Sequence, residues 1–371
     1  MARVFYIGAP LHARLAENGS VADLLLSTGK NTGNLLIGDA IQRHLKADLH
    51  QGDLSRDPDE IKRNFDCVVI GASNFLFSGF DFGHYALFLE KVDLPCVIIG
   101  LGAQAPNFAS RVEVPAGTQR MVRAISARCV SMGVRGYFTA AILIDMGIKN
   151  VRVIGCPSMF WSCQPALNFA HRQTKNDLAV ALNGSANVVQ HSFNIEAAKK
   201  VEIMLARLSF EKSYPYILQN ERELMEIASR NGNGFDKGMI RRLMTQYGLS
   251  QMWPEAFVQR VKQNMRFYTS VETWHAAMAH FDFVTGTRFH GCLMGLLAGV
   301  PCQTIIHDAR VREMCELMNI PHVDVAKIDR LDIHRLYASF DPAPVQIAYR
   351  YLYQNYVDFL EENRLEHNLS R

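Results

Sequence analysis

The sequence lacks the long apolar run that a membrane-spanning helix needs. No stretch of its 371 residues approaches the roughly 18 or more consecutive apolar residues of such a helix. The amino terminus, Met-Ala-Arg-Val-Phe-Tyr-Ile-Gly, predicts a strand and has too short an apolar length for a signal peptide. We therefore expect a soluble, cytoplasmic protein. This expectation includes a protein that acts at the inner face of a membrane without spanning it.

The net charge of the protein is also small. The formal net charge is +3, and the lysines and arginines are scattered along the chain. A nucleic-acid-binding or membrane-binding protein would be expected to carry a basic block, because such partners are recognised largely through phosphate charge. We therefore expect no nucleic-acid partner, and any anion site must be local.

The sequence has no metal, redox or nucleotide motif. The closest pair of its eight cysteines, Cys156 and Cys163, is too far apart for a C-x-x-C motif. No H-E-x-x-H or EF-hand loop occurs, Lys30 lacks a P-loop frame, and Gly100-x-Gly102 lacks the third glycine of a dinucleotide fingerprint. These absences predict buried reduced thiols, no obligatory metal and no cofactor.

The sequence contains enough apolar residues to form a large hydrophobic core. Apolar residues make up 49% of the chain and charged residues 20%, and the length exceeds the roughly 100 to 200 residues of one domain. Apolar strand-like segments that end in glycine or small polar residues alternate with helical patterns, in two successive series. This alternation predicts an α/β fold with two Rossmann-like, doubly wound domains.

The expected boundaries follow the change of pattern. The periodicity lapses from Ser162 to Lys175, which marks the linker. We place an N-terminal domain at 1–165, a C-terminal domain at 176–335 and a helical segment at 336–371.

That last segment predicts one amphipathic helix, from its apolar positions at Ile347, Tyr351, Leu352, Tyr356, Phe359 and Leu360. Its tyrosines are expected to pack in the core, and any exposed member would suit stacking on a sugar ring.

One stretch, Phe281 to Pro301, concentrates the chemistry. A predicted strand, Phe281 to Thr285, is joined to a small-residue helical segment by a turn that contains Gly286, Arg288, His290 and Gly291. Open α/β folds bind ligands at such strand ends, and a helix start directs unpaired N–H groups at the same space. A guanidinium and an imidazole in that turn predict an anion site with a titratable group.

The same stretch resembles the polysaccharide pyruvyl transferase family. The resemblance is carried by Gly286-Thr287-Arg288-Phe289-His290-Gly291, Ala298-Gly299-Val300-Pro301 and Asp308-Ala309-Arg310-Val311, with weaker similarity at Asn31–Asn34 and Arg135–Ser158. It implies a GT-B-like architecture with a cleft between the domains. It also implies phosphoenolpyruvate as donor, a saccharide or lipid-linked oligosaccharide as acceptor, and a cyclic pyruvate ketal as product.

The resemblance assigns roles to particular residues. His290 matches the histidine proposed to protonate the donor, while Arg288, Arg135 and Arg310 would hold its anionic groups. The backbone at Gly291 would approach the ligand. The family usually has lysine at the position of Arg310.

The resemblance also places Asn34 where the family usually has an acid, which leaves Asp39 as a substitute for that acid.

Other readings of these residues stay open. Arg135 would equally pair with a helix end or with Asp145, and Arg312 would replace Arg310 if the latter faces solvent. His290 would otherwise fix the turn or only bind phosphate. His307 and Asp308 suit either a base dyad or a helix cap, and we favour the cap.

Two further functional classes compete with the transferase. A GT-B glycosyltransferase would hold the diphosphate of a nucleotide sugar at the same helix start, although no acidic residue for its ribose is evident. A sugar-phosphate sensor or scaffold would use the same fold without catalysis.

Overall fold

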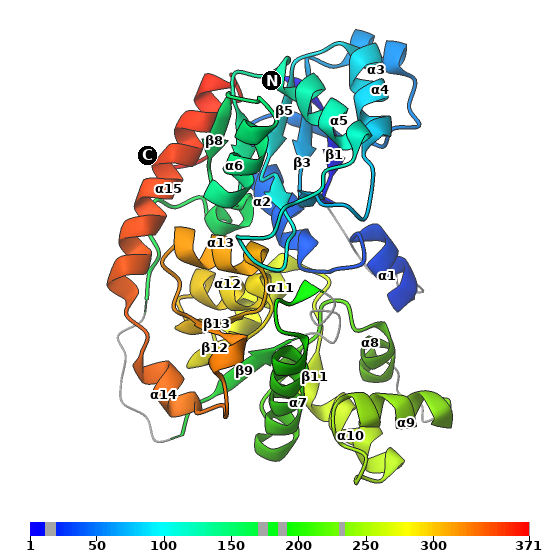
Figure 1. Ribbon diagram of the computed structural model, residues 1–371, viewed down its shortest axis with the longest axis vertical. Helices are drawn as coiled ribbons and strands as arrows, with labels where there is room; N and C mark the ends of the chain where they lie inside the picture. The colour runs from blue at the N-terminus through cyan, green and yellow to red at the C-terminus, as the bar shows by residue number, and fades with distance from the viewer. Residues whose placement is uncertain (12–19, 170–176, 185–190, 230–233, 371) are drawn as a thin grey trace.

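The computed structural model describes residues 1–11, 20–169, 177–184, 191–229 and 234–370. Two parallel β-sheets, one in each half of the chain, are flanked by helices (Figure 1). The predicted fold class, α/β with two doubly wound Rossmann-like units and a C-terminal helix, is confirmed. The predicted domain boundaries stay a prediction, and part of the expected linker lies outside the described residues.

The first sheet has the order β2-β1-β3-β5, with all strands parallel. A parallel bridge from Leu101 to Val134 joins a further strand pair, β7 and β8, beside β5. A short parallel pair, β4 and β6, follows the ends of β3 and β5. The bounds are β1 Arg3–Gly8, β2 Asp48–Gln51, β3 Cys67–Gly71, β4 Asn74–Leu76, β5 Cys96–Ile99, β6 Gly102–Ala103, β7 Met132–Val134 and β8 Val151–Val153.

The second sheet has the order β11-β10-β9-β12-β13-β14, again all parallel. Its first strand in sequence is therefore third in space, which is the strand order of a Rossmann fold. The order reverses between β9 and β12, where open sheets of this kind bind ligands. The bounds are β9 Val180–Asn183, β10 Tyr216–Ile217, β11 Met265–Arg266, β12 Phe283–Gly286, β13 Cys302–Ile306 and β14 His322–Asp324.

Helices connect the parallel strands, as parallel pairing requires. In the first half they are α1 Val21–Ser27, α2 Asn34–His44, α3 Pro58–Asn64, α4 Gly83–Val92, α5 Ala116–Ser126 and α6 Tyr137–Asp145, with the 3-10 turn η1 Pro157–Phe160. In the second half they are α7 Ile195–Lys212, α8 Arg222–Ser229, α9 Lys237–Gln246, α10 Pro254–Asn264, α11 Val271–Met278, α12 Phe289–Leu297, α13 Ala309–Leu317, α14 Ile333–Ala338 and α15 Pro342–Glu362, with the 3-10 turn η3 Val325–Lys327. Within the described ranges, every helix is too short or too polar to span a bilayer.

The last helix, α15, returns to the first half of the chain (Figure 1). The Tyr356 hydroxyl lies 3.0 Å from Nδ1 of His44 on α2, and Nε of Arg152 on β8 donates to Asn355 at 2.7 Å. Phe359 packs against the backbone of β7, because a Cβ at Gly133 would lie 2.8 Å from its ring. The final helix therefore ties the two sheets together.

The structure corrects one expectation for α15. Leu352, Tyr356, Phe359 and Leu360 are buried as predicted, together with Tyr349 and Tyr353. Ile347 and Tyr351 are 71% and 66% exposed and do not belong to the core. Their side chains lie on the face of α15 that turns toward α13 and α6.

Candidate active site

The turn between β12 and α12 forms because glycine ends the strand. Gly286 has a φ of +152°, and a Cβ there would lie 1.6 Å from the carbonyl oxygen of Asn183 on β9. Only glycine permits that close approach of the two strand ends. The helix α12 then begins at Phe289 with no side-chain cap, so its first N–H groups are open to a ligand.

Asn183, at the end of β9, fixes the turn from the other side. Its carbonyl accepts from the Thr287 N–H at 3.1 Å, and its side-chain Oδ1 accepts from the Arg288 N–H at 2.9 Å. A Cβ on Gly291 would lie 2.7 Å from Cγ of Asn183. Gly291 thus allows α12 to pack on β9 and does not line the cavity described next.

A cavity of about 170 Å³ lies between the two halves of the chain at this turn. It brings together five of the residues predicted from the sequence, which come from α2, the end of β7, the α12 turn and the start of α13. Its lining is Gly29, Asn31, Asn34, Ser73, Asn74, Arg135, Gln219, Arg288, Phe289, His290, Arg310 and Met314. We call it the cationic pocket, because three arginines face it.

Arg288 is buried beside an acidic partner. Its side chain is bonded through Nη2 to Oδ1 of Asn220, and the same nitrogen lies 3.2 Å from Oε1 of Glu221. Its Nε has no hydrogen-bond partner among the described residues. The guanidinium is therefore held on one edge and free to donate from another.

Arg135 is fixed by carbonyl groups of the first half. Its Nε donates to the Gly100 carbonyl at 2.9 Å, its Nη2 to the Ala72 carbonyl at 3.3 Å and its Nη1 to Oδ1 of Asn74 at 2.9 Å. It is 2% exposed and makes no ion pair with Asp145. These hydrogen-bond acceptors are neutral, and the positive charge of Arg135 contributes to lowering the pKa of His290 in the pocket.

Arg310 is oriented by a helix cap. Asp308 accepts from the Val311 N–H at 2.8 Å and so caps α13, as expected. Its other oxygen lies 3.1 Å from Nη2 of Arg310 and 3.2 Å from Nε2 of His307. Arg312, the alternative, pairs with Asp324 at 3.1 Å and does not line the pocket.

A hydrogen-bond chain joins the arginines of the two halves. From Arg135 it runs to Asn74, whose Nδ2 donates to Oε1 of Gln104 at 3.3 Å. Nε2 of Gln104 then donates to Oδ2 of Asp308 at 3.0 Å, the oxygen that holds Arg310. The separation of these two cations is thus set by side chains that cross between the halves.

His290 stands in the first turn of α12, among the arginines. Its Nε2 lies 3.8 Å from Sγ of Cys156, and a Cβ on Gly33 would come within 3.1 Å of its Nδ1. Burial, followed by Arg135, Arg310 and Arg288, lowers the pKa of His290 well below its usual 6.5. The imidazole is therefore neutral at neutral pH until negative charge enters the pocket.

Asn34, at the position of the family's acid, and Asp39, the possible substitute for that acid, lie in different surroundings on α2. Asn34 lines the pocket, and its Nδ2 donates to the Thr28 carbonyl at 2.9 Å. Asp39 lies one turn further along α2, where its Oδ1 accepts from Nε of Arg43 at 2.8 Å and from Nε1 of Trp161 at 2.5 Å. Asp39 does not line the pocket, so it does not replace the missing acid.

Sequence reasoning missed several lining residues, of which Gln219 is the most informative. It is 1% exposed and its Nε2 has no hydrogen-bond partner among the described residues. It follows β10, just as Ser73 and Asn74 follow β3. Polar residues after parallel strands were the available signal, because such ends meet at one edge of a sheet.

Comparison with known proteins identifies the family. The geometry defines an α/β fold with two parallel sheets and an arginine-lined pocket between them. The chain belongs to the polysaccharide pyruvyl transferase family, whose family model matches residues 31–308. A search among curated proteins finds no match.

Solved structures resemble the chain at low identity. UDP-N-acetylglucosamine 2-epimerase from Rickettsia bellii is 9% identical, with 97% of this chain and 96% of that chain covered and a TM-score of 0.48. MnaA from S. aureus, in a co-structure with UDP, is 10% identical, with 100% and 93% covered and a TM-score of 0.41.

Proposed function

We propose that the protein transfers the pyruvyl unit of phosphoenolpyruvate to two hydroxyl groups of a saccharide, which forms a cyclic ketal. The observation that carries this proposal is the convergence of Arg135, Arg288 and Arg310 on His290 in one cavity. Family membership supports the transferase class and the polysaccharide acceptor. The donor is our inference from the chemistry of the pocket.

The charge of the pocket suits a small dianionic or trianionic donor. Phosphoenolpyruvate carries a phosphate and a carboxylate, and the planar fork of an arginine pairs such groups through two parallel hydrogen bonds. The free Nε of Arg288 and the uncapped start of α12 add further donors. The three cations belong to two halves of the chain, so the donor would be held from both sides.

The size of the pocket favours phosphoenolpyruvate over a nucleotide sugar. Its volume of about 170 Å³ is below the roughly 300 to 1,000 Å³ of pockets that hold drug-sized ligands. A nucleoside diphosphate with its sugar is in that larger class. A glycosyltransferase reading would therefore need room beyond this cavity.

The proposed chemistry involves three proton transfers. The His290 imidazolium gives its proton to the methylene carbon of the donor, and the neighbouring carbon becomes an oxocarbenium-like electrophile. A saccharide hydroxyl attacks that carbon and returns its proton to the imidazole. A second hydroxyl then forms the other C–O bond, and phosphate leaves with that hydroxyl's proton.

The lowered pKa of His290 fits this sequence. In the free protein three guanidinium groups and burial disfavour the imidazolium. A bound donor brings negative charge beside the ring, which opposes the arginines and raises the pKa. His290 would thus take up its proton together with the donor, and solvent would not discharge it beforehand.

The acceptor is proposed as a hexose unit of a surface polysaccharide or of its lipid-linked precursor. Such a precursor is assembled where phosphoenolpyruvate is available, which is why we propose a cytoplasmic place of action, including work at the inner face of the membrane.

A ligand-induced thermal shift tests the donor. Phosphoenolpyruvate should stabilise the protein by about 2.7 kcal/mol at a hundredfold excess over its dissociation constant, and Arg288→Ala should abolish this shift. Arg312→Ala, a change of an arginine outside the pocket, should preserve it. Stabilisation by UDP or UDP-sugars with none by phosphoenolpyruvate would replace the proposal with a glycosyltransferase.

A non-catalytic sensor is tested with His290→Ala. The variant should still show the phosphoenolpyruvate shift but release no phosphate with acceptor. Unchanged biological output from a folded, inactive variant would favour the sensor.

A further inference from the structure

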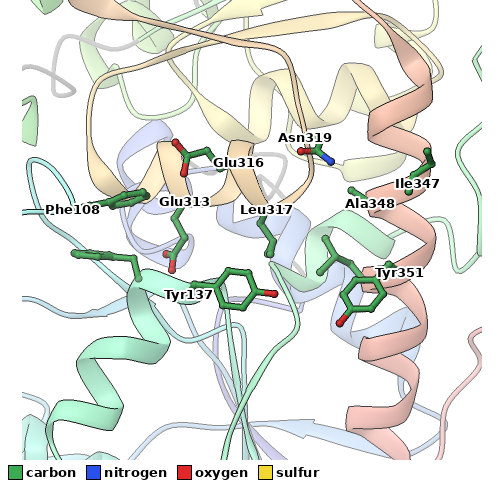
Figure 2. Close-up of a pocket in the computed structure, with 11 residues that line it drawn as sticks. Phe108, Tyr137, Glu313, Glu316, Leu317, Asn319, Ile347, Ala348 and Tyr351 are labelled. Carbon is green, nitrogen blue, oxygen red and sulfur yellow. The ribbon is translucent and has the colours of Figure 1, made fainter.

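A second cavity, about 660 Å³ in volume, is lined by other residues of α13 than the cationic pocket (Figure 2). Its walls come from the start of α6, from α13, from α15 and from the loop that carries Phe108. Its lining is Phe108, Tyr137, Phe138, Glu313, Glu316, Leu317, Asn319, Ile347, Ala348, Tyr351 and Leu352. We call it the aromatic pocket.

Its largest side chains are exposed rings. Tyr137 is 67% exposed and Tyr351 66%, and neither ring stacks on another ring within the described residues. Figure 2 shows the two tyrosines along one edge of the cavity, with Leu317 directed between them. Phe108 stacks on Phe138 at the opposite end, with ring centroids 5.1 Å apart. The protein thus leaves flat apolar faces uncovered around a hollow.

The polar groups of this cavity are two carboxyl groups, one amide and two tyrosine hydroxyl groups, with no cation among the lining residues. The two oxygens of Glu313 each accept one hydrogen bond, from the N–H of Thr139 at 2.8 Å and from its hydroxyl at 2.9 Å. A carboxylate oxygen accepts more than one bond. Glu316 and Asn319 stand at the rim from the end of α13 (Figure 2).

We propose that the aromatic pocket is a binding subsite for a neutral pyranose unit of an oligosaccharide. A pyranose ring has apolar C–H faces that pack on tyrosine rings, and hydroxyl groups that donate to carboxylates. The lack of lining cations argues against a phosphate or an acidic sugar, which the cationic pocket attracts. That the saccharide is the acceptor of the transfer rests on the proposed function.

The two pockets share their dividing wall. Arg135 faces the cationic pocket and Tyr137, two residues later, the aromatic one. On α13, Met314 lines the first and Glu313 the second, and a Cβ on Gly136 would lie 2.3 Å from Cγ of Glu313. An acceptor several sugars long would therefore hold one unit in the aromatic pocket while another unit meets the donor.

A lipid chain is a poorer occupant. Glu316 and Asn319 are exposed at the rim of the cavity. An acyl chain would cover these polar groups without offering a hydrogen bond, which carries a desolvation cost. A sugar hydroxyl can donate to the Glu316 carboxyl group and to the side-chain oxygen of Asn319.

Saturation-transfer NMR with lactose, cellobiose, mannobiose and maltotriose tests the subsite on the full-length protein. At least one of these neutral saccharides should receive saturation from the wild-type protein. The signal should disappear in Tyr351→Ala and in Tyr137→Ala, two changes of exposed side chains that leave the core intact. Trp253→Ala, which removes a 79% exposed ring just before α10, should preserve it.

The outcomes separate this proposal from the donor assignment. No signal with any saccharide, or a signal that survives both tyrosine changes, would overturn the subsite, whatever phosphoenolpyruvate does. Saccharide binding that depends on Tyr351, in a protein that phosphoenolpyruvate does not stabilise, would keep the subsite and refute the donor. Sedimentation of a Tyr351-dependent dimer, or flotation with phosphatidylglycerol vesicles that requires Tyr351, would assign the pocket to another occupant.

Discussion

The two pockets differ in what fixes their side chains. In the cationic pocket each arginine is held by a carboxylate or a carbonyl, and a hydrogen-bond chain sets the distance between Arg135 and Arg310. In the aromatic pocket Tyr137 and Tyr351 stand exposed, about two-thirds uncovered. Catalysis requires charged groups that are held in fixed positions, whereas the binding of a sugar tolerates aromatic side chains that change their orientation. Under the two proposals, one protein wall would serve chemistry at one pocket and sugar recognition at the other.

The largest effect should come from replacing His290, the proposed general acid of the cationic pocket. His290→Gln removes the titrating group and should lower kcat by about 10²- to 10⁴-fold, the usual contribution of a positioned acid or base. Phosphate release in the presence of acceptor measures it. His50→Gln, on an exposed strand of the first sheet, is the matched control and should leave kcat unchanged. A His290→Gln enzyme within threefold of wild type would exclude the proton-transfer role.

The next effect concerns the charge at Arg310. Arg310→Ala should raise the KM for phosphoenolpyruvate by about 10- to 100-fold, because a hydrogen bond to a charged group contributes roughly 1.5 to 3 kcal/mol. Arg310→Lys, which keeps the charge and matches the lysine implied by the family resemblance, should raise it less. Steady-state kinetics at saturating acceptor give both values. If Arg312→Ala has the larger effect, the assignment of the cation is wrong.

A third prediction concerns the protonation of Glu313, which lines the aromatic pocket. Burial raises the pKa of Glu313 to about 7, against 4.5 in an exposed carboxyl group. The folded state therefore binds more protons than the unfolded state between these values, and the free energy of unfolding should fall by about 2 kcal/mol from pH 5 to pH 7 through this group. Urea unfolding measures it.

Glu313→Gln, which does not titrate, should remove this part of the pH dependence. An unchanged slope in that variant would mean that Glu313 ionises normally in the folded protein.

The smallest effect should come from breaking the hydrogen-bond chain between the two halves of the protein at Gln104. Gln104→Ala removes the donor to Asp308 and the acceptor for Asn74, so the two arginines lose their common spacer. The KM for phosphoenolpyruvate should rise by about 3- to 10-fold, the equivalent of about 0.5 to 1.5 kcal/mol of net hydrogen-bond energy, with the melting temperature nearly constant. Gln119→Ala, at an amide that bonds only within its own half at 3.0 Å to Val114, should leave KM unaltered.

The strands and the turn chemistry were predictable because they are local. The apolar run Cys96–Ile99 coincides with β5, and the apolar run Cys67–Ile70 ends one residue before β3 does. The predicted strand Phe281–Thr285 begins two residues before β12. The short polar strand β2, Asp48–Gln51, was missed, since its residues are mostly exposed at a sheet edge.

The partners within the site were not predictable, because tertiary packing decides them. Nothing in the spacing of Arg135 and Asn74 indicates that they meet, and Gln104 and Asp308 are more than two hundred residues apart in sequence. Periodicity likewise marks Tyr351 as part of an apolar helix face but does not say whether a neighbour covers it. In the structure α13 stands away from that ring and leaves the hollow of Figure 2.

The return of α15 to the first sheet also bears on how the chain is made. Phe160, in the first half, packs against Tyr349, Tyr353 and Tyr356 of α15, and β1 and β9 contribute to one continuous apolar core. Domains often fold in order as they leave the ribosome. Here the core that β1 shares with β9 is completed only after residues beyond 340 have emerged, whereas the other face of the first sheet, with Phe5, Val68 and Ile98, has a separate core built from the first half alone.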